Sequence, residues 1–216
     1  LMDNHEISQT IKAKILEAAL VDLAFDGFTD AVVEKAGQSA GIEPAETAFA
    51  FPRGGIDLAI YFVRDGVAEM EAKLASLDIE SMKIRERIKN AVQTRLEIDA
   101  DNKEIARRAF NMLALPGNAK AASICLAHTV DVMWRSTGDK STDFNFYTKR
   151  ATLAAVYSAT RLFWLNDDST DAQDSWAFLD RRIDNVMQIE KGKAKFRELQ
   201  DRLGNPLETL AKFRYR

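Results

Sequence analysis

Apolar residues recur every three or four positions along most of the chain, a pattern typical of helices that bury one side. Near the start, one face of the predicted helix carries Ile7, Ile11, Ile15, Ala19 and Leu23. This helix should end near Gly27, because glycine readily adopts the left-handed conformation that closes helices. Two short helices should follow, from Thr29 or Asp30 to Ala40 and from Pro44 to about Phe51.

Longer helices are predicted beyond the Pro52-Arg53-Gly54-Gly55 break, over residues 57–76, 82–100, 103–115, 119–135, 143–165 and 171–190. The helix over 119–135 is apolar on nearly all sides, which favours a position in the middle of the fold. No segment shows a convincing strand pattern. We therefore expect an all-α fold of nine or ten helices, with a head over 1–56, a larger helical domain over 57–190 and a tail over 191–216.

The composition excludes several classes of function. The 216 residues are 46% hydrophobic and 29% charged, with a formal net charge of -3, as in ordinary globular proteins. Cys125 is the one cysteine, and His5 and His128 are the two histidines. An intrachain disulfide, a cysteine-based zinc site and a di-iron centre with two Glu-x-x-His motifs are therefore all excluded. We expect Cys125 to be an inert core residue and His128 a buried, hydrogen-bonded one rather than a metal ligand next to Asp131.

No motif for catalysis stands out either. The chain has no glycine-rich phosphate loop and no nucleophile elbow, so we expect no enzyme activity, no cofactor and no metal. The first residues have neither the basic nor the apolar region of a signal peptide, and every run of about 20 residues contains charges. A protein of a reducing compartment without a membrane span is the expectation.

The tail has a different charge from the rest. Residues 192–216 carry seven basic and three acidic side chains, a net charge of +4 on an acidic chain. Asn205 and Pro206 can begin a short helix with apolar residues on one face and basic residues elsewhere. Such a helix can lie on an anionic membrane surface, and a frayed terminus is the alternative.

The head resembles the DNA-binding head of the TetR repressor family, through Gly27-Phe28, Ala40-Gly41-Ile42 and Ala50-Phe51. It departs from that family at two positions, since Ala48 stands where a tyrosine is usual and Gly54 where a phosphate-contacting lysine is usual. Residues 29–55 contain two basic and four acidic side chains, although DNA affinity comes mainly from basic residues that neutralise phosphates. We therefore expect a structural module that does not bind DNA sequence-specifically.

The C-terminal part carries the more specific resemblance. Gly138-Asp139-Lys140-Ser141-Thr142-Asp143-Phe144-Asn145-Phe146-Tyr147-Thr148-Lys149-Arg150-Ala151 and the blocks 157–169 and 176–183 resemble the lipid-binding accessory protein family of ubiquinone biosynthesis. The resemblance implies a TetR-like homodimer that binds an isoprenoid quinone lipid and presents it to demethoxyubiquinone hydroxylase. It also implies a location in the bacterial cytoplasm, with peripheral inner-membrane contact, or on the matrix side in mitochondria.

Two groups of candidate residues follow. The resemblance implies a surface patch for lipid or hydroxylase contact at Asp143, Phe146, Tyr147 and Arg150, with phenylalanine at 146 where the family often has tryptophan. Arg150 is also the candidate for a structural ion pair.

The helix over 143–165 has two apolar faces, which need two partners, such as the core and a second subunit. Leu162 and Leu165 are expected in the core. For the lipid we predict a pocket with the walls Phe110, Leu113, Met133, Trp134 and Tyr157. A ligand-responsive repressor and a dimeric scaffold whose pocket is filled by its own side chains are the alternatives.

Overall fold

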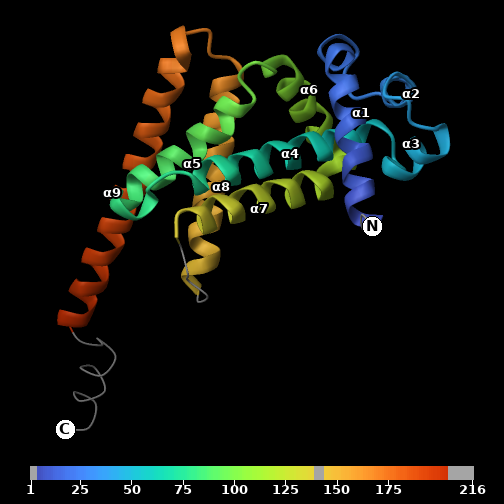
Figure 1. Ribbon diagram of the computed structural model, residues 1–216. Coiled ribbons are helices and arrows are strands. Elements are labelled where there is room, and N and C mark those ends of the chain that lie inside the picture. Colours follow the sequence, from blue (N-terminus) through green and yellow to red (C-terminus); the bar gives the residue numbers. More distant parts are fainter. Residues whose placement is uncertain (1–3, 139–143, 204–216) are drawn as a thin grey trace.

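The computed structural model describes residues 4–138 and 144–203, and all regular structure within these ranges is helical (Figure 1). The main helices are α1 (Asn4–Asp26), α2 (Asp30–Ser39), α3 (Pro44–Ala50), α4 (Gly55–Ala75), α5 (Ile84–Ile98), α6 (Lys103–Ala114), α7 (Ala119–Ser136), α8 (Phe144–Leu165) and α9 (Gln173–Leu203). Short 3-10 turns occupy Ile79–Ser81, Pro116–Asn118 and Thr170–Ala172. The prediction of an all-α fold is confirmed.

Helices α1, α2 and α3 form the head at the N-terminal end of the molecule (Figure 1). The predicted helix ends are found: Gly27 has a φ of +69°, and the Thr29 hydroxyl accepts a 3.3 Å hydrogen bond from the Val32 N–H. Asp30 has a different task. Its Oδ1 accepts a 2.9 Å hydrogen bond from the Gly55 N–H at the start of α4, and so ties the head to the rest of the chain.

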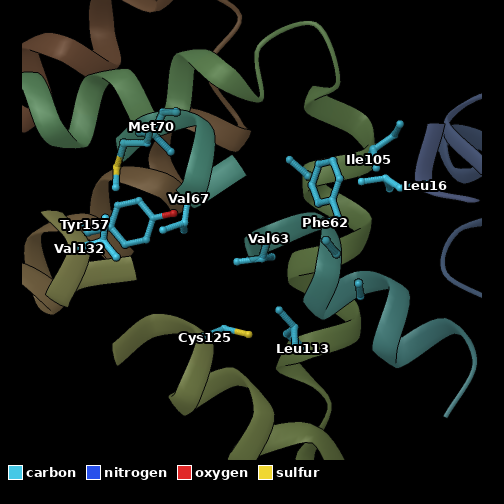
Figure 2. Packing of buried hydrophobic residues seen from close by; sticks show 14 of the residues in the cluster. Leu16, Phe62, Val63, Val67, Met70, Ile105, Leu113, Cys125, Val132 and Tyr157 are labelled. Atoms are coloured by element: carbon cyan, nitrogen blue, oxygen red, sulfur yellow. The ribbon is translucent and has the colours of Figure 1, made fainter. Parts of the chain in front are cut away.

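The body is built around α4, which contacts α5, α6 and α7, while α8 packs between α7 and α9. Figure 1 shows α4 and α7 running side by side away from the head. Buried apolar side chains from head and body form one continuous cluster, so the two parts share a core. Figure 2 shows the middle of this cluster, where Val63, Leu113 and Cys125 come together from α4, α6 and α7.

A buried carboxylate closes the turn between α8 and α9. Asp167 is 8% exposed and accepts hydrogen bonds from the Ser169 N–H at 2.8 Å, the Ser175 N–H at 2.9 Å and the Ser175 hydroxyl. Burial alone would raise the pKa of Asp167, but the hydrogen bonds from Ser169 and Ser175 outweigh it and hold the pKa well below its ordinary value. This turn sets the angle at which α9 returns along α8.

Three local predictions are wrong. The last helix continues past Glu190 to Leu203, and its end extends beyond the other helices (Figure 1). The α7 helix is buried on one side only: Ile124 is 47% exposed and His128 is exposed, not buried. Leu162 is 52% exposed, whereas Leu165 is buried as expected. A nearly uniform apolar pattern does not show which face of a helix is buried. In α7 the buried face is the one that packs against α4 and α8.

Among the described residues, no helix combines the length and apolar character needed to cross a bilayer. The predicted tail helix from Asn205 onward lies outside the described residues, as does Asp143.

Candidate functional site

The first candidate site is a cavity of about 140 Å³ between α4, α6, α7 and α8, which we call the Arg161 cavity. Its lining residues are Val63, Phe110, Leu113, Ala114, Ala122, Cys125, Leu126, Thr129, Tyr157, Ser158 and Arg161. Three of the five predicted pocket residues, Phe110, Leu113 and Tyr157, therefore line one space. Tyr157 and Leu113 are almost fully buried and form its inner part, whereas Ala114 is exposed at its edge.

Arg161 is the residue of this cavity that sequence reasoning missed. Its side chain is only 9% exposed, and its guanidinium lies 5.4 Å from the centre of the Phe110 ring. A signal was available, because Arg161 stands four residues after Tyr157 and so falls on the same face of α8. Fully buried arginines are rare unless they are paired, so an arginine on the core-facing side of α8 points to a specific task.

The thiol of Cys125 lies at the inner boundary of the cavity. Cys125 is 4% exposed, and burial raises the pKa of its thiol, although the positive charges of Arg64 and Arg161 act in the opposite direction. The thiol is therefore protonated at neutral pH and packs as a small apolar group, as the sequence predicted.

A larger groove adjoins the Arg161 cavity at Cys125, which lines both spaces. This head–body groove has a volume of about 730 Å³ and lies between α1, the end of α3, α4 and α7. It combines apolar side chains, among them Phe49, Ile60 and Ile124, with the basic side chains of Lys12 and Lys120. The groove is larger than the cavity and falls in the range of roughly 300–1,000 Å³ that ligand sites usually occupy.

The other two predicted pocket residues lie elsewhere. Trp134 belongs to a separate cavity of about 260 Å³, on the side of α8 that faces α5 and α9. Residues Ile84, Ile88, Trp134, Thr148, Lys149, Thr152, Leu153, Val156, Ile183, Val186 and Met187 line this Trp134 cavity. Met133 is fully buried in the core and lines neither cavity. The five residues therefore do not surround one space, since Tyr157 and Trp134 line two different cavities beside α8 and Met133 lines neither of them.

The predicted surface patch is described only in part. Tyr147 is 71% exposed at the start of α8. Arg150 Nε donates to Asp131 Oδ1 at 2.8 Å, and Arg135 Nε lies 3.0 Å from the other oxygen of the same carboxylate, so the predicted ion pair of Arg150 is confirmed. The backbone of Phe146 lies in α8, while its side chain and Asp143 lie outside the described part. Because Asp131 already pairs with two arginines, it is poorly placed to bind a metal ion together with His128.

The head carries acidic side chains near the positions where TetR repressors contact DNA. Gly54, at the position of the usual lysine, has a φ of +57°, and a Cβ there would come 1.9 Å from Asp30 Oδ1. The Asp30 carboxylate thus lies at the N-terminus of α4, where a DNA phosphate would otherwise be favoured. In α3, Glu46 accepts a 3.4 Å hydrogen bond from the Glu43 N–H, which makes these acids part of the helix cap.

Comparison with solved structures supports the fold. A TetR transcriptional regulator from Nitrosomonas europaea superposes with a TM-score of 0.68, covering 83% of this chain and 99% of the regulator, at 17% sequence identity. At this identity the likeness concerns the fold alone, and the predicted TetR-like architecture is confirmed.

Comparison with known sequences identifies the family. A family model described as COQ9 matches residues 119–190, which include α7, α8 and the first half of α9. The human mitochondrial ubiquinone biosynthesis protein COQ9 is 36% identical over 194 residues, which are 87% of this chain and 61% of the human protein. The chain thus spans about three-fifths of the length of the mammalian relatives. The mitochondrial ubiquinone biosynthesis protein coq9 of Schizosaccharomyces pombe is 31% identical over 87% of this chain and 75% of its own length. This chain belongs to the COQ9 family.

Proposed function

We propose that this protein is a non-catalytic accessory protein of ubiquinone biosynthesis, which binds an isoprenoid quinone intermediate and presents it to the di-iron hydroxylase. The observation that carries the proposal is the family relationship, which extends over 194 residues and includes both the head and the body. The human and Schizosaccharomyces pombe relatives are named as mitochondrial proteins of ubiquinone biosynthesis. For this chain we propose the corresponding place, on the matrix side in mitochondria or in the cytoplasm of a bacterium.

The shape of the body supports lipid binding. A polyprenyl chain is nearly insoluble in water, so a carrier must replace its hydration with apolar contacts along much of its length. The head–body groove and the adjoining Arg161 cavity offer a path of this kind, with Phe49, Ile124 and Phe110 along it. The groove is open, so a long chain can lie along it without being fully enclosed. The Arg161 cavity alone is far too small for the whole lipid.

The contact with the hydroxylase is proposed at the start of α8. Tyr147 presents a large amphipathic ring to solvent, and exposed aromatic side chains are common anchors of protein interfaces. Asp143 and Phe146 belong to the same proposed patch through the family resemblance. Arg150 supports this surface by joining α8 to α7 through Asp131.

We also propose a homodimer through α8 and α9. The exposed outer surface of this pair includes Leu162 and Phe163, and the Phe163 ring stacks on Phe178 with 4.6 Å between ring centres. Apolar side chains displayed at one place on adjacent helices favour association with a second copy. The tail over 191–216 would add peripheral membrane contact, since residues 192–216 carry a net charge of +4 and anionic lipids attract basic segments.

The presentation step can be tested with purified components. Hydroxylase turnover on a demethoxyubiquinone substrate should rise when this protein is added, and Tyr147→Ala should reduce that rise by about tenfold, the loss of an interface anchor of roughly 1.4 kcal/mol. Phe25→Ala is the matched control, because Phe25 is an equally exposed aromatic residue of α1 in the head. Equal turnover with and without the protein would contradict the proposal.

A repressor function is the second candidate, and the head disfavours it. With Asp30 at the start of α4 and acidic side chains in α3, the surface that faces DNA in TetR repressors is poor in phosphate contacts. Fluorescence anisotropy at low salt, with DNA from upstream of its own gene, should show no tight binding. Sequence-selective binding that weakens steeply with salt would instead favour the repressor.

A further inference from the structure

The buried guanidinium of Arg161 faces an apolar cavity without a matching anion. Its Nη2 atom is buried and has no hydrogen-bond partner, and in the described ranges 4–138 and 144–203 no carboxylate lies within 4.0 Å of the side chain. The guanidinium lies 5.4 Å from the centre of the Phe110 ring. A cation–π contact offsets only part of the hydration that a buried guanidinium loses.

A comparison within the same body shows what a structural buried arginine looks like. Arg95 is fully buried, and its Nη1 lies 2.8 Å from Oδ2 of Asp99, one helical turn away. That pairing compensates the charge inside the protein, as is usual for buried ions. Nitrogens of both arginines lack a hydrogen-bond partner, but only Arg95 has a carboxylate beside it that balances its charge. For Arg161, a ligand oxygen or a water molecule from outside the chain would supply the acceptor for the buried Nη2. The position of Arg161 on the cavity wall shows where that acceptor would lie.

The size of the cavity limits what the acceptor can be attached to. A volume of about 140 Å³ resembles the engineered cavity of about 150 Å³ that holds one benzene molecule. The cavity thus accommodates a single six-membered ring and excludes a polyprenyl chain. Its walls also suit a flat ring, because Phe110 and Tyr157 are aromatic and most of the other lining residues are aliphatic.

The polar groups of the cavity are few. The Thr129 hydroxyl already donates to the Cys125 carbonyl at 2.8 Å. Arg161 is then the charged donor of the lining, and the hydroxyls of Tyr157 and Ser158 are uncharged. One guanidinium among apolar walls cannot replace the hydration of a phosphate dianion, which needs several donors. An oxygen on an otherwise apolar ring needs one or two donors, which is what this cavity provides.

We propose that the Arg161 cavity binds an oxygenated six-membered ring, with an Arg161 N–H donating a hydrogen bond to a carbonyl or phenolic oxygen of that ring. This inference builds on the proposed function by placing the headgroup of the quinone lipid in the cavity and its chain toward the head–body groove, which the cavity meets at Cys125. Arg161 then selects an oxygenated headgroup over a plain hydrocarbon.

The test uses a ring without a chain. The full protein is titrated with 2-methyl-1,4-benzoquinone and with toluene, which has the same carbon skeleton but no oxygen, and binding is followed by ligand-observed NMR. Wild-type protein should bind the quinone ring at least tenfold more tightly than toluene, and Arg161→Met should remove this preference. Arg181→Met is the matched control, since Arg181 also lies over a phenylalanine ring but is exposed, and it should change the quinone affinity less than twofold.

Several outcomes would overturn the inference: no quinone binding by the wild type, equal quinone affinity in Arg161→Met, or displacement of the quinone by millimolar inorganic phosphate. If Arg161→Met does not fold, the guanidinium N–H signals of Arg161 in the wild type should shift when the quinone is added, and unchanged signals would contradict the inference. If Arg161→Met binds the quinone as tightly as the wild type and the protein still co-purifies with lipid, this headgroup site is refuted and the proposed function stays intact. If quinone binding depends on Arg161 but the protein neither co-purifies with lipid nor affects the hydroxylase, the ring site is supported and the proposed function is refuted.

Discussion

Gly66 in α4 and Arg95 in α5 lie in direct contact: a Cβ at residue 66 would come 2.9 Å from Nη2 of Arg95 and 3.0 Å from Cζ. Both residues are buried, and the guanidinium occupies the space that a side chain on Gly66 would need. The absence of a Cβ at residue 66 therefore determines how closely α4 and α5 can pack around a buried charge.

Gly66→Ala should destabilise the protein, because the added methyl group pushes the guanidinium away from its position beside Asp99. Overpacking of this kind costs about 1–3 kcal/mol, which urea denaturation should show as a lower midpoint. Gly117→Ala is the control, since a Cβ there meets nothing within 4 Å. A Gly66→Ala protein as stable as the wild type would show that Arg95 can move freely.

Asp99→Asn should be more damaging. It removes the carboxylate that lies 2.8 Å from Arg95 Nη1 and leaves a buried positive charge without compensation. Breaking a buried ion pair in this way costs about 3–5 kcal/mol, measurable as a loss in the free energy of unfolding. The exposed Asp101→Asn should have little effect, and an equally small effect of Asp99→Asn would mean that water reaches Arg95.

These contacts show what the sequence could predict. Helix ends at Gly27, Thr29 and Pro44 were found within a residue or two, because caps and breakers act locally. The contact between Gly66 and Arg95 joins two different helices, so no local sequence pattern predicts it. The predicted pocket shows the same limit. Phe110, Leu113 and Tyr157 do line one cavity, but Trp134 lines another, because spacing along α7 and α8 does not reveal on which side of α8 a distant residue packs.

Asp167 should make the stability depend on pH in the acidic range. Its pKa is depressed in the folded protein, so its contribution is complete above the ordinary pKa of about 4 and is lost as the pH falls toward the folded-state value. Asp167→Asn should therefore be less stable than the wild type at pH 7, and the difference should shrink between pH 5 and pH 2.5. A difference that stays constant over this range would assign the effect to altered packing, not to the charge.

Leu162→Glu should weaken the proposed dimer. A charge at this exposed apolar position on α8 would oppose a second copy but leave the monomer folded, because the side chain is 52% exposed. Analytical ultracentrifugation should show a wild-type dimer and a largely monomeric variant. Leu115→Glu, at a position 53% exposed beyond α6, is the control and should stay dimeric. A monomeric wild type at micromolar concentration would refute the dimer.

Identification of the lipid that the purified protein carries tests the central claim most directly. Lipids extracted from wild-type protein are analysed by mass spectrometry, alongside Ala122→Phe, which should fill part of the Arg161 cavity, and Ser123→Phe, which adds the same ring at an exposed neighbouring position of α7. We predict a polyprenylated quinone or phenol at a substantial fraction of one per chain in the wild type and in Ser123→Phe, and at least fivefold less in Ala122→Phe. Wild-type protein that carries no such lipid, even after expression in a ubiquinone-producing host, would contradict the account.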